Sequence, residues 1–249
     1  MRKQVVFLSV VIPAYNEAEN FKAGILTPVA EYLASQKYSW EVILVDDGST
    51  DTIAKLLAEY CNQHAGFKLL RIDHGGKAAA VTAGVLAAAG EIILFTDFDQ
   101  STPLAEVGKF IDHHQLGADV VISYRIGRRD TLVAKMRGWA FVTLVQLVAL
   151  PGILDSQCGF KSFKQDAARK IFSNLKATKS GEKIRGGYMG AFDVEALFLA
   201  RKLGYRIDQV PVEWVRYVSN RLNIWTEPIK MVRDTFKVRL YDILGKYEQ

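Results

Sequence analysis

Two aspartates separated by one residue are the clearest candidates for chemistry in this chain. Asp97 and Asp99 follow the apolar segment 91–96, which is typical of a buried strand. If the chain stays extended through Asp99, both carboxylates project from the same face. Two carboxylates about 5 Å apart repel each other by about 3 kcal/mol at an effective dielectric constant of about 20. A bound Mg²⁺ or Mn²⁺ would offset that repulsion.

The competing interpretation of these acids is a solvated turn before the helix that we predict over 103–114. An isolated Asp-x-Asp pattern is a weak motif and by itself favours such a turn. The elements that position the two acids must therefore decide between a turn and a metal site.

The composition is that of an ordinary globular protein. The chain has 249 residues, of which 49% are hydrophobic and 24% are charged, and this size suits one large domain. Its formal net charge of +5 favours anionic partners such as phosphate esters, nucleic acids or acidic membranes. Cys61 and Cys158 show neither zinc-site spacing nor a disulfide framework, so the reducing cytosol is expected and secretion is not.

Strands and helices are predicted to alternate as far as the acids. The expected strands are 5–12, 40–45, 67–72 and 91–96, and the expected helices are about 16–36, 52–64 and 76–89. We expect Pro13 to end the first strand and Asn16 to start the first helix in a capping box. The alternation predicts an α/β fold with a doubly wound, mainly parallel sheet and helices on both faces.

Polar loops at 13–17, 46–51 and 97–101 follow three of these strands. In such a sheet, ligands bind outside the carboxyl ends of the strands, where these loops are expected to meet. A dinucleotide-binding fold would need a Gly-x-Gly-x-x-Gly turn at 13–17, and the sequence has none there. Lys77 follows two glycines at a helix start and could present a cation to an anion, although a plain helix start is the simpler interpretation.

The second half of the chain begins with a basic cluster and an apolar segment. A strand predicted at 119–123 is followed by a cluster of basic residues, Arg125, Arg128, Arg129, Lys135 and Arg137. They form either a solvated surface loop or a group of positive charges that faces the acids. The apolar segment 139–154 is too short and interrupted for a span, which takes about 20 apolar residues. It is expected to be a core helix or a helix lying in a membrane interface.

Further elements are predicted towards the carboxyl end. They are a turn and strand over 155–163, helices over 164–172 and 192–203, a mobile loop or lid over 176–190, a strand at 206–210 ended by Pro211, and an amphipathic helix over 224–247. We expect the last helix to pack on the domain, with membrane contact or dimerisation as its second role.

Several segments, taken in order, closely resemble the family 2 glycosyltransferases. They are Val10 to Glu17, Val45 to Asp51, Gly76-Lys77, Thr96 to Asp99, Ser123 to Arg125, Asp155 to Lys161 and Phe192 to Glu195. The Asp155 to Lys161 segment is most similar to the polyprenyl-phosphate branch, the dolichyl-phosphate mannose and glucose synthases, and to its glucosyl members in particular. Each segment alone is a weak signal, and the ordered set is a strong one.

The resemblance implies a GT-A catalytic domain over residues 1–217 and an amphipathic helical extension over 218–249. It implies inverting transfer of a hexose, glucose from UDP-glucose, onto a polyprenyl or dolichyl phosphate. The enzymatic alternatives are a GDP-mannose-dependent mannosyltransferase and a transferase to a saccharide hydroxyl. The non-enzymatic alternative is a nucleotide-sugar-binding protein. Nucleic acid is not expected as a partner, because stacking aromatics do not interleave with the basic residues.

The resemblance also assigns site residues. The donor is assigned to Pro13, Ala14, Tyr15, Glu17, Asp46, Asp47, Lys77, Asp97 and Phe98, with Asp97 and Asp99 holding Mg²⁺ or Mn²⁺. Catalytic roles are assigned to Asp99, Arg125, Arg137 and Asp155. The two arginines would contact phosphate groups of the acceptor or donor. Asp155 would either contact the acceptor or the sugar, or have a structural role. Synthases of this type usually have alanine where Phe98 stands, so the shape of the sugar site is expected to differ.

A lipid phosphate acceptor suits these residues chemically. A saccharide hydroxyl needs a general base, whereas a phosphate is already ionised at neutral pH and needs only cationic positioning. None of the histidines, His64, His74, His113 and His114, stands where we would place a base. The protein is therefore expected in the cytoplasm, peripheral at the cytosolic face of a membrane.

Overall fold

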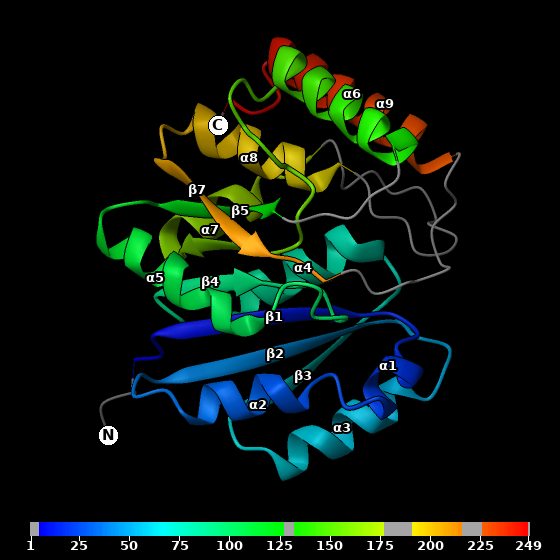
Figure 1. The fold of residues 1–249 in the computed structure, drawn as a ribbon, viewed down its shortest axis with the longest axis vertical. Helices are drawn as coiled ribbons and strands as arrows, with labels where there is room; N and C mark the ends of the chain where they lie inside the picture. Colours follow the sequence, from blue (N-terminus) through cyan, green and yellow to red (C-terminus); the bar gives the residue numbers. More distant parts are fainter. Residues whose placement is uncertain (1–4, 127–131, 177–190, 216–225, 249) are drawn as a thin grey trace.

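A computed structural model describes residues 5–126, 132–176, 191–215 and 226–248, with the side chains at 132–137, 139 and 226–229 left out. Within these ranges a seven-stranded sheet has the order β3-β2-β1-β4-β6-β5-β7 (Figure 1). Its strands are β1 Leu8–Ala14, β2 Trp40–Asp47, β3 Phe67–Ile72, β4 Ile92–Phe95, β5 Val120–Ile126, β6 Lys161–Lys164 and β7 Ile207–Glu213. Only β6 runs antiparallel to its neighbours in this sheet, so the predicted mainly parallel α/β fold is confirmed.

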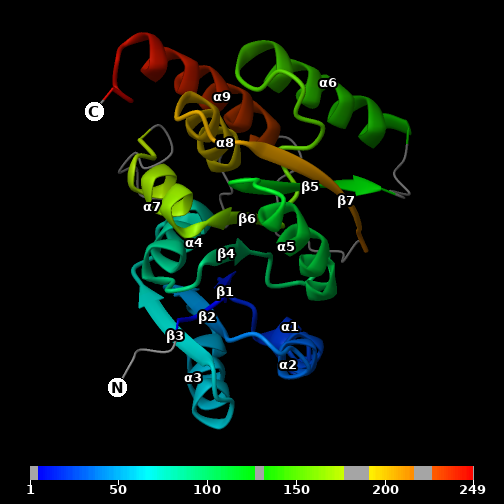
Figure 2. The same ribbon diagram turned by 90° about the vertical axis from the view of Figure 1, so that its left-hand side faces the viewer.

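Helices cover both faces of the sheet (Figures 1 and 2). They are α1 Ala18–Lys22, α2 Thr27–Ala34, α3 Ile53–Gln63, α4 Gly76–Ala87, the short 3₁₀ helix η1 Leu104–Glu106, α5 Val107–Gln115, α6 Leu132–Val148, α7 Gln165–Ser173, α8 Phe192–Lys202 and α9 Thr226–Ile243. Alternate strand residues enter two cores: Val11 and Ile43 pack with α4, α7 and α8, whereas Val10 and Leu44 pack with α2, α3 and α5.

Two prolines lie inside strands that they were predicted to end. β1 continues through Pro13 to Ala14 and pairs with β2 throughout. β4 pairs with β1 only as far as Val11, so at Pro13 the strand has one neighbour and needs hydrogen bonds on one side only. Pro211 is tolerated within β7 for a similar reason, because β7 is an edge strand.

The capping box predicted at Asn16 is wrong. Asn16 has a φ of 54°, in the left-handed region that asparagine tolerates. Its Oδ1 accepts hydrogen bonds from the N–H groups of Thr50, at 2.8 Å, and Asp51, at 3.2 Å. The predicted first helix is divided into α1 and α2, with Gly24 at a φ of 80° between them. Asn16 therefore ties the loop after β1 to the loop after β2.

The helices α6 and α9 pack side by side at one end of the molecule (Figures 1 and 2). The apolar segment predicted at 139–154 forms the second half of α6 and the turn after it. Val145 and Leu150 are buried in the core, whereas Leu147 is 81% exposed. The core-helix interpretation therefore accounts for one side of this segment. Among the described residues, α6, α9 and the other helices are too short or too polar to cross a membrane.

Candidate active site

The strand before the acids is shorter than predicted. β4 ends at Phe95, and Phe98 and Asp99 lie in a turn, so Asp97 and Asp99 do not share a face of one extended strand. The N–H of Ser101 donates to Asp99 Oδ1 at 2.9 Å and holds this turn. The two acids still interact. Burial raises the pKa of Asp99, and the negative charge of Asp97 raises it further.

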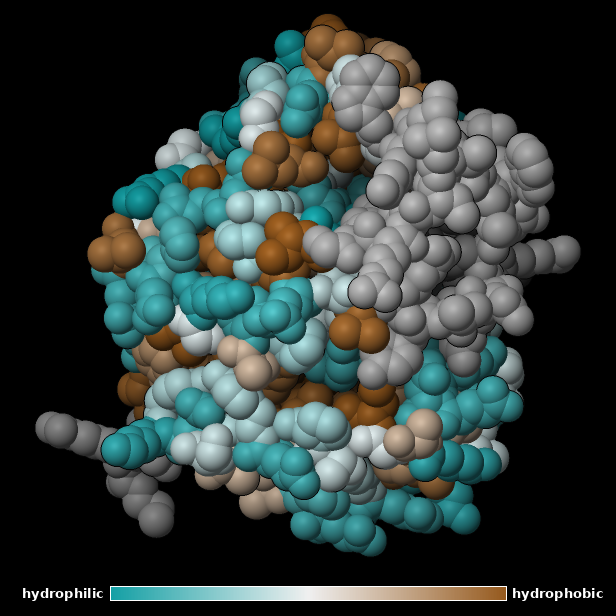
Figure 3. Space-filling model, in the orientation of Figure 1, coloured by the Kyte–Doolittle hydropathy of each residue, from teal (hydrophilic) through white to brown (hydrophobic). Residues whose placement is uncertain are grey.

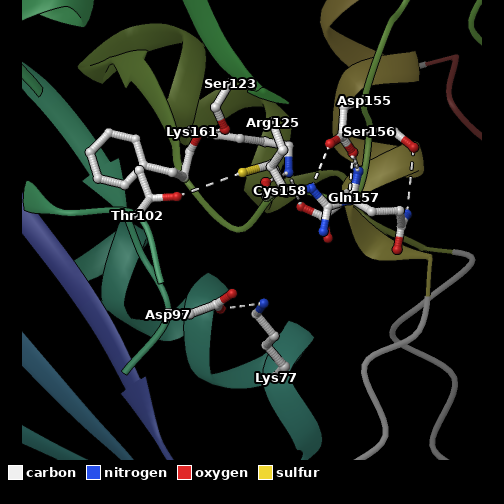
Figure 4. A network of polar contacts seen from close by, with 12 residues as sticks. Lys77, Asp97, Thr102, Ser123, Arg125, Asp155, Ser156, Gln157, Cys158 and Lys161 are labelled. Carbon is white, nitrogen blue, oxygen red and sulfur yellow. Dashed lines mark hydrogen bonds and ion pairs between the residues drawn. The ribbon is translucent and has the colours of Figure 1, made fainter. Parts of the chain in front are cut away.

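Lys77, in the first turn of α4, supplies a cation beside the acids (Figure 4). Its Nζ lies 2.5 Å from Asp97 Oδ1. Burial by itself lowers the pKa of the Lys77 ammonium, but the charges of Asp97 and Asp193 outweigh burial and the pKa lies above its ordinary value. Lys77 is therefore protonated at neutral pH and offsets part of the acidic charge.

Asp97 and Asp99 fit a hard divalent cation as a partial ligand set. Carboxylate oxygens are the ligands that Mg²⁺ takes, and Mg²⁺ is usually held by one or two carboxylates together with substrate phosphates. Burial raises the pKa of Asp99 and the charge of Asp97 raises it further, and a bound cation would favour the ionised carboxylate against both effects. In the described ranges, His, Cys, Asp and Glu side chains form no cluster of three or more that could hold a metal.

Asp47 joins the loops after β2 and β3. Its Oδ1 accepts the N–H of Gly75 at 2.8 Å, and its Oδ2 accepts the N–H of Gly76 at 2.9 Å and lies 2.9 Å from His74 Nδ1. Burial raises the pKa of Asp47 by more than these contacts lower it. The Tyr15 ring stacks on His74 with centroids 4.2 Å apart. His74 thus lies among the predicted donor residues, a position that sequence reasoning missed.

Two further acids assigned to the donor, Asp46 and Glu17, form hydrogen bonds with other residues of the protein. Asp46 is fully buried, and its carboxylate accepts hydrogen bonds from Ser49 N–H at 3.1 Å and Arg71 Nε at 3.2 Å. Glu17 Oε2 accepts a hydrogen bond from Asn20 Nδ2 at 2.6 Å. These contacts shape the loops at the carboxyl ends of β1 and β2.

Ala14 and Phe98 are core residues. They are 2% and 3% exposed and belong to the core that contains α2, α3 and α5. The apolar ring of Phe98 is stabilised there by burial and anchors the acid loop, and the assignment of Phe98 to the donor stays a prediction. Pro13, also assigned to the donor, lies in β1 one residue before the strand ends.

Arg125 and Asp155 form a bidentate ion pair opposite Lys77 and Asp97 (Figure 4). Arg125 Nε donates to Asp155 Oδ2 at 2.7 Å, and Nη2 donates to Oδ1 at 3.0 Å. Burial alone would raise the pKa of Asp155, but the guanidinium outweighs it and the pKa lies below its ordinary value. Asp155 is therefore ionised and a poor general base. The sequence predicted both residues separately and missed their pairing.

The loop before β6 contacts the acid loop directly. Lys161 is fully buried; its Nζ lies 2.6 Å from Asp193 Oδ1 on α8 and also donates to the carbonyl of Cys158. These bonds hold Gly159 so close to Asp97 that a Cβ on Gly159 would lie 2.1 Å from Asp97 Oδ2. The motif containing Gly159 was recognised from the sequence, but this contact was not.

The predicted site residues and the basic cluster therefore come together only in part within the described structure. Asp97, Asp99, Lys77, Arg125 and Asp155 lie around one region of the carboxyl edge. The side chains of Arg128, Arg129, Lys135 and Arg137 lie outside the described residues, as does the predicted lid beyond Lys176.

A mainly parallel sheet with acidic loops at the carboxyl ends of its strands defines the chain as a GT-A protein. Glucosyl-3-phosphoglycerate synthase from Mycobacterium tuberculosis, solved with Mg²⁺ and UDP, has the same fold, with a TM-score of 0.61 at 20% identity over 94% of this chain and 79% of that one. The profile of glycosyl transferase family 2 matches residues 9–172, and the chain belongs to this family.

Relatives that match almost the whole chain support the same assignment. Dolichyl-phosphate beta-glucosyltransferase of Dictyostelium discoideum is 31% identical over 96% of this chain and 76% of its own length. The dolichyl-phosphate beta-glucosyltransferase of Saccharomyces cerevisiae is 29% identical over 97% of this chain and 77% of its own length. The protein is therefore a glycosyltransferase, as the sequence predicted.

Gly159→Ala tests the contact between the two loops. The added methyl group must push the Asp97 carboxylate away from Lys77, so we expect transfer activity to fall by about tenfold or more. Gly108→Ala is the matched control, because a Cβ there meets nothing within 4 Å. Initial rates and thermal unfolding measure both effects. Wild-type rates in Gly159→Ala would show that the position of Asp97 is unimportant.

Proposed function

We propose that this glycosyltransferase moves glucose from UDP-glucose, with inversion, onto the phosphate of a polyprenyl phosphate of the dolichyl type. The observation that carries the proposal is the Arg125–Asp155 pair, which sets a guanidinium opposite the acids that suit the donor's diphosphate. The names of the relatives, which specify dolichyl phosphate and glucose, support the same acceptor and sugar.

The donor's diphosphate is assigned to the acid loop. Asp97 and Asp99 would hold Mg²⁺ or Mn²⁺, and the M. tuberculosis synthase of the same fold was crystallised with Mg²⁺ and UDP. Such a cation offsets the charge that grows on the departing UDP. Lys77 adds a fixed positive charge beside it, and Tyr15, with the loop after β2, is assigned to uracil and ribose.

The acceptor's phosphate is assigned to Arg125. An ionised phosphate oxygen attacks C1 of glucose, and the bond from C1 to the UDP oxygen breaks on the opposite side. A phosphate monoester carries about −1.5 to −2 charges at neutral pH, so no proton has to be removed from it. The low pKa of Asp155 fits this scheme, because the residue is needed to orient Arg125 and not to accept a proton.

The direct test is incubation of the purified protein with a short polyprenyl phosphate, Mg²⁺ or Mn²⁺, and radiolabelled UDP-glucose or GDP-mannose. We expect a lipid-linked glucose that forms only with UDP-glucose and disappears with a chelator. A lipid-linked mannose would reassign the sugar, and a product formed only with saccharide acceptors would contradict the lipid. Donor binding without any product would indicate a binding protein.

An exposed apolar face on α9 supports peripheral membrane contact at the cytosolic side, where the lipid acceptor would be embedded. Phe236, Leu240 and Ile243 on α9, and Leu244 directly after it, lie at helical spacing and are 51–73% exposed. Figure 3 shows hydrophobic side chains, with polar ones between them, at the end of the molecule where α6 lies in front of α9. Cys61 and Cys158 are free thiols, which suits a reducing compartment.

Ile243→Glu tests this contact. Ile243 is 73% exposed, and burying such a side chain in a lipid interface stabilises binding by about 1.5–3 kcal/mol, so the charge should weaken vesicle binding about tenfold or more. Leu116→Glu, at a 70% exposed leucine after α5, is the control. Flotation with vesicles containing phosphatidylserine measures both, and equal binding by the two variants would contradict the contact.

A further inference from the structure

We propose that Trp214 is a positioning residue that fixes the Arg125 guanidinium for the acceptor's phosphate. The inference rests on the proposed function, because it concerns the same acceptor site. Trp214 directly follows β7, whose last pair with β5 joins Glu213 to Ile126. Its ring therefore lies at the carboxyl edge of the sheet, and the Arg125 guanidinium carbon is 5.4 Å from the ring centroid.

Arg125 is restrained by Asp155 and Trp214 in complementary ways. Asp155 binds one edge of the planar guanidinium through Nε and Nη2. The indole ring contacts the guanidinium as a cation–π partner, which attracts its charge without accepting any of its hydrogen bonds. The aromatic contact therefore limits the motion of the cation without competing for its N–H groups. An arginine that binds phosphate benefits from such restraint, because less side-chain entropy is lost on binding.

The same segment is connected to the donor side by two hydrogen bonds. The N–H of Val215 donates to the carbonyl of Ser101 at 2.8 Å, and the N–H of Ser101 donates to Asp99 Oδ1 at 2.9 Å. The residue after Trp214 is thus attached to the turn that holds Asp99. This connection sets the position of the indole, and through it that of Arg125, relative to the acids assigned to the donor.

Steady-state kinetics of Trp214→Leu and Trp214→Phe test the inference. Leucine keeps apolar bulk without a ring, so we expect the KM for a short polyprenyl phosphate to rise about fivefold or more, with the KM for UDP-glucose within about twofold of wild type. Phenylalanine keeps an aromatic face and should restore most of the acceptor affinity. An unchanged acceptor KM in Trp214→Leu would overturn the inference. So would equal losses in both variants with matching falls in Tm, because they would indicate packing alone.

A shape-preserving substitution covers the case in which Trp214→Leu does not fold. Difluorotryptophan placed at position 214 weakens the negative potential of the ring face and leaves its size nearly unchanged. We expect the acceptor KM to rise by about twofold or more, with Tm and donor KM unchanged. An unchanged acceptor KM would contradict a role of the ring face. A wild type that makes no lipid-linked glucose contradicts the proposed function, whereas an active wild type matched by these variants contradicts only the role of Trp214.

Discussion

Asp99→Asn is expected to reduce glucose transfer by about 10²- to 10³-fold while the protein stays as stable as wild type or becomes more stable. The activity falls because a neutral amide is a weak ligand for a divalent cation, whose stabilisation of the leaving group amounts to several kcal/mol. In the wild type, the N–H of Ser101 donates a hydrogen bond to Asp99 Oδ1. The fold survives because the amide oxygen of asparagine can accept the same hydrogen bond. Initial rates over a range of Mn²⁺ concentrations and thermal unfolding measure the two effects.

The sign of the stability change follows from the raised pKa of Asp99. A carboxyl whose pKa is higher in the folded state than in the unfolded state costs stability when it is ionised, and that cost disappears as pH falls through the folded-state pKa. Any gain in Tm should therefore be present at about pH 8 and shrink towards acid pH. Asp112→Asn, at an exposed position on α5, is the control. An Asp99→Asn rate equal to wild type at limiting Mn²⁺ would remove Asp99 from the metal site.

Arg125→Ala is expected to lower transfer about 100-fold or more and to lower stability as well. The activity falls because the acceptor phosphate loses its cation. The stability falls because Asp155, only 8% exposed, keeps its charge and loses its partner, at a cost of about 1–3 kcal/mol, reduced from that of a fully buried pair. At neutral pH this should appear as a Tm lower by about 3–10 °C.

The double variant Arg125→Ala/Asp155→Asn separates the two roles of Arg125. Removing the unpaired carboxylate should recover most of the lost Tm, because position 155 then carries no unpaired buried charge. Activity should stay low, because the guanidinium is still absent. Since the pKa of Asp155 is now depressed by Arg125, the Arg125→Ala defect in Tm should also shrink as pH falls and Asp155 becomes protonated. Recovery of both Tm and turnover in the double variant would show that Arg125 is purely structural.

Local sequence patterns predicted the elements of the fold better than their ends. The alternation of apolar strands with amphipathic helices is set by the periodicity of each segment, so the sheet and the polar loops beyond its strands could be predicted. The ends at Pro13 and Pro211 could not, because a proline is tolerated where a neighbouring strand is missing, and strand order is not a local property. Asn16 was assigned to its own helix for the same reason, since its partners lie more than 30 residues away.

The sequence by itself determined which residue types stand at the carboxyl ends of the strands: Asp97 and Asp99 after one strand, Arg125 in another and Asp155 in a separate motif. Only the tertiary structure decided how they pair. The sheet order places β4, β6, β5 and β7 side by side, so the loops that carry Asp97, Gly159 and Trp214 meet near Arg125 at the end of β5, although these residues are far apart in sequence. Electrostatic and steric contacts act over a few ångströms of space, and sequence spacing does not encode those distances.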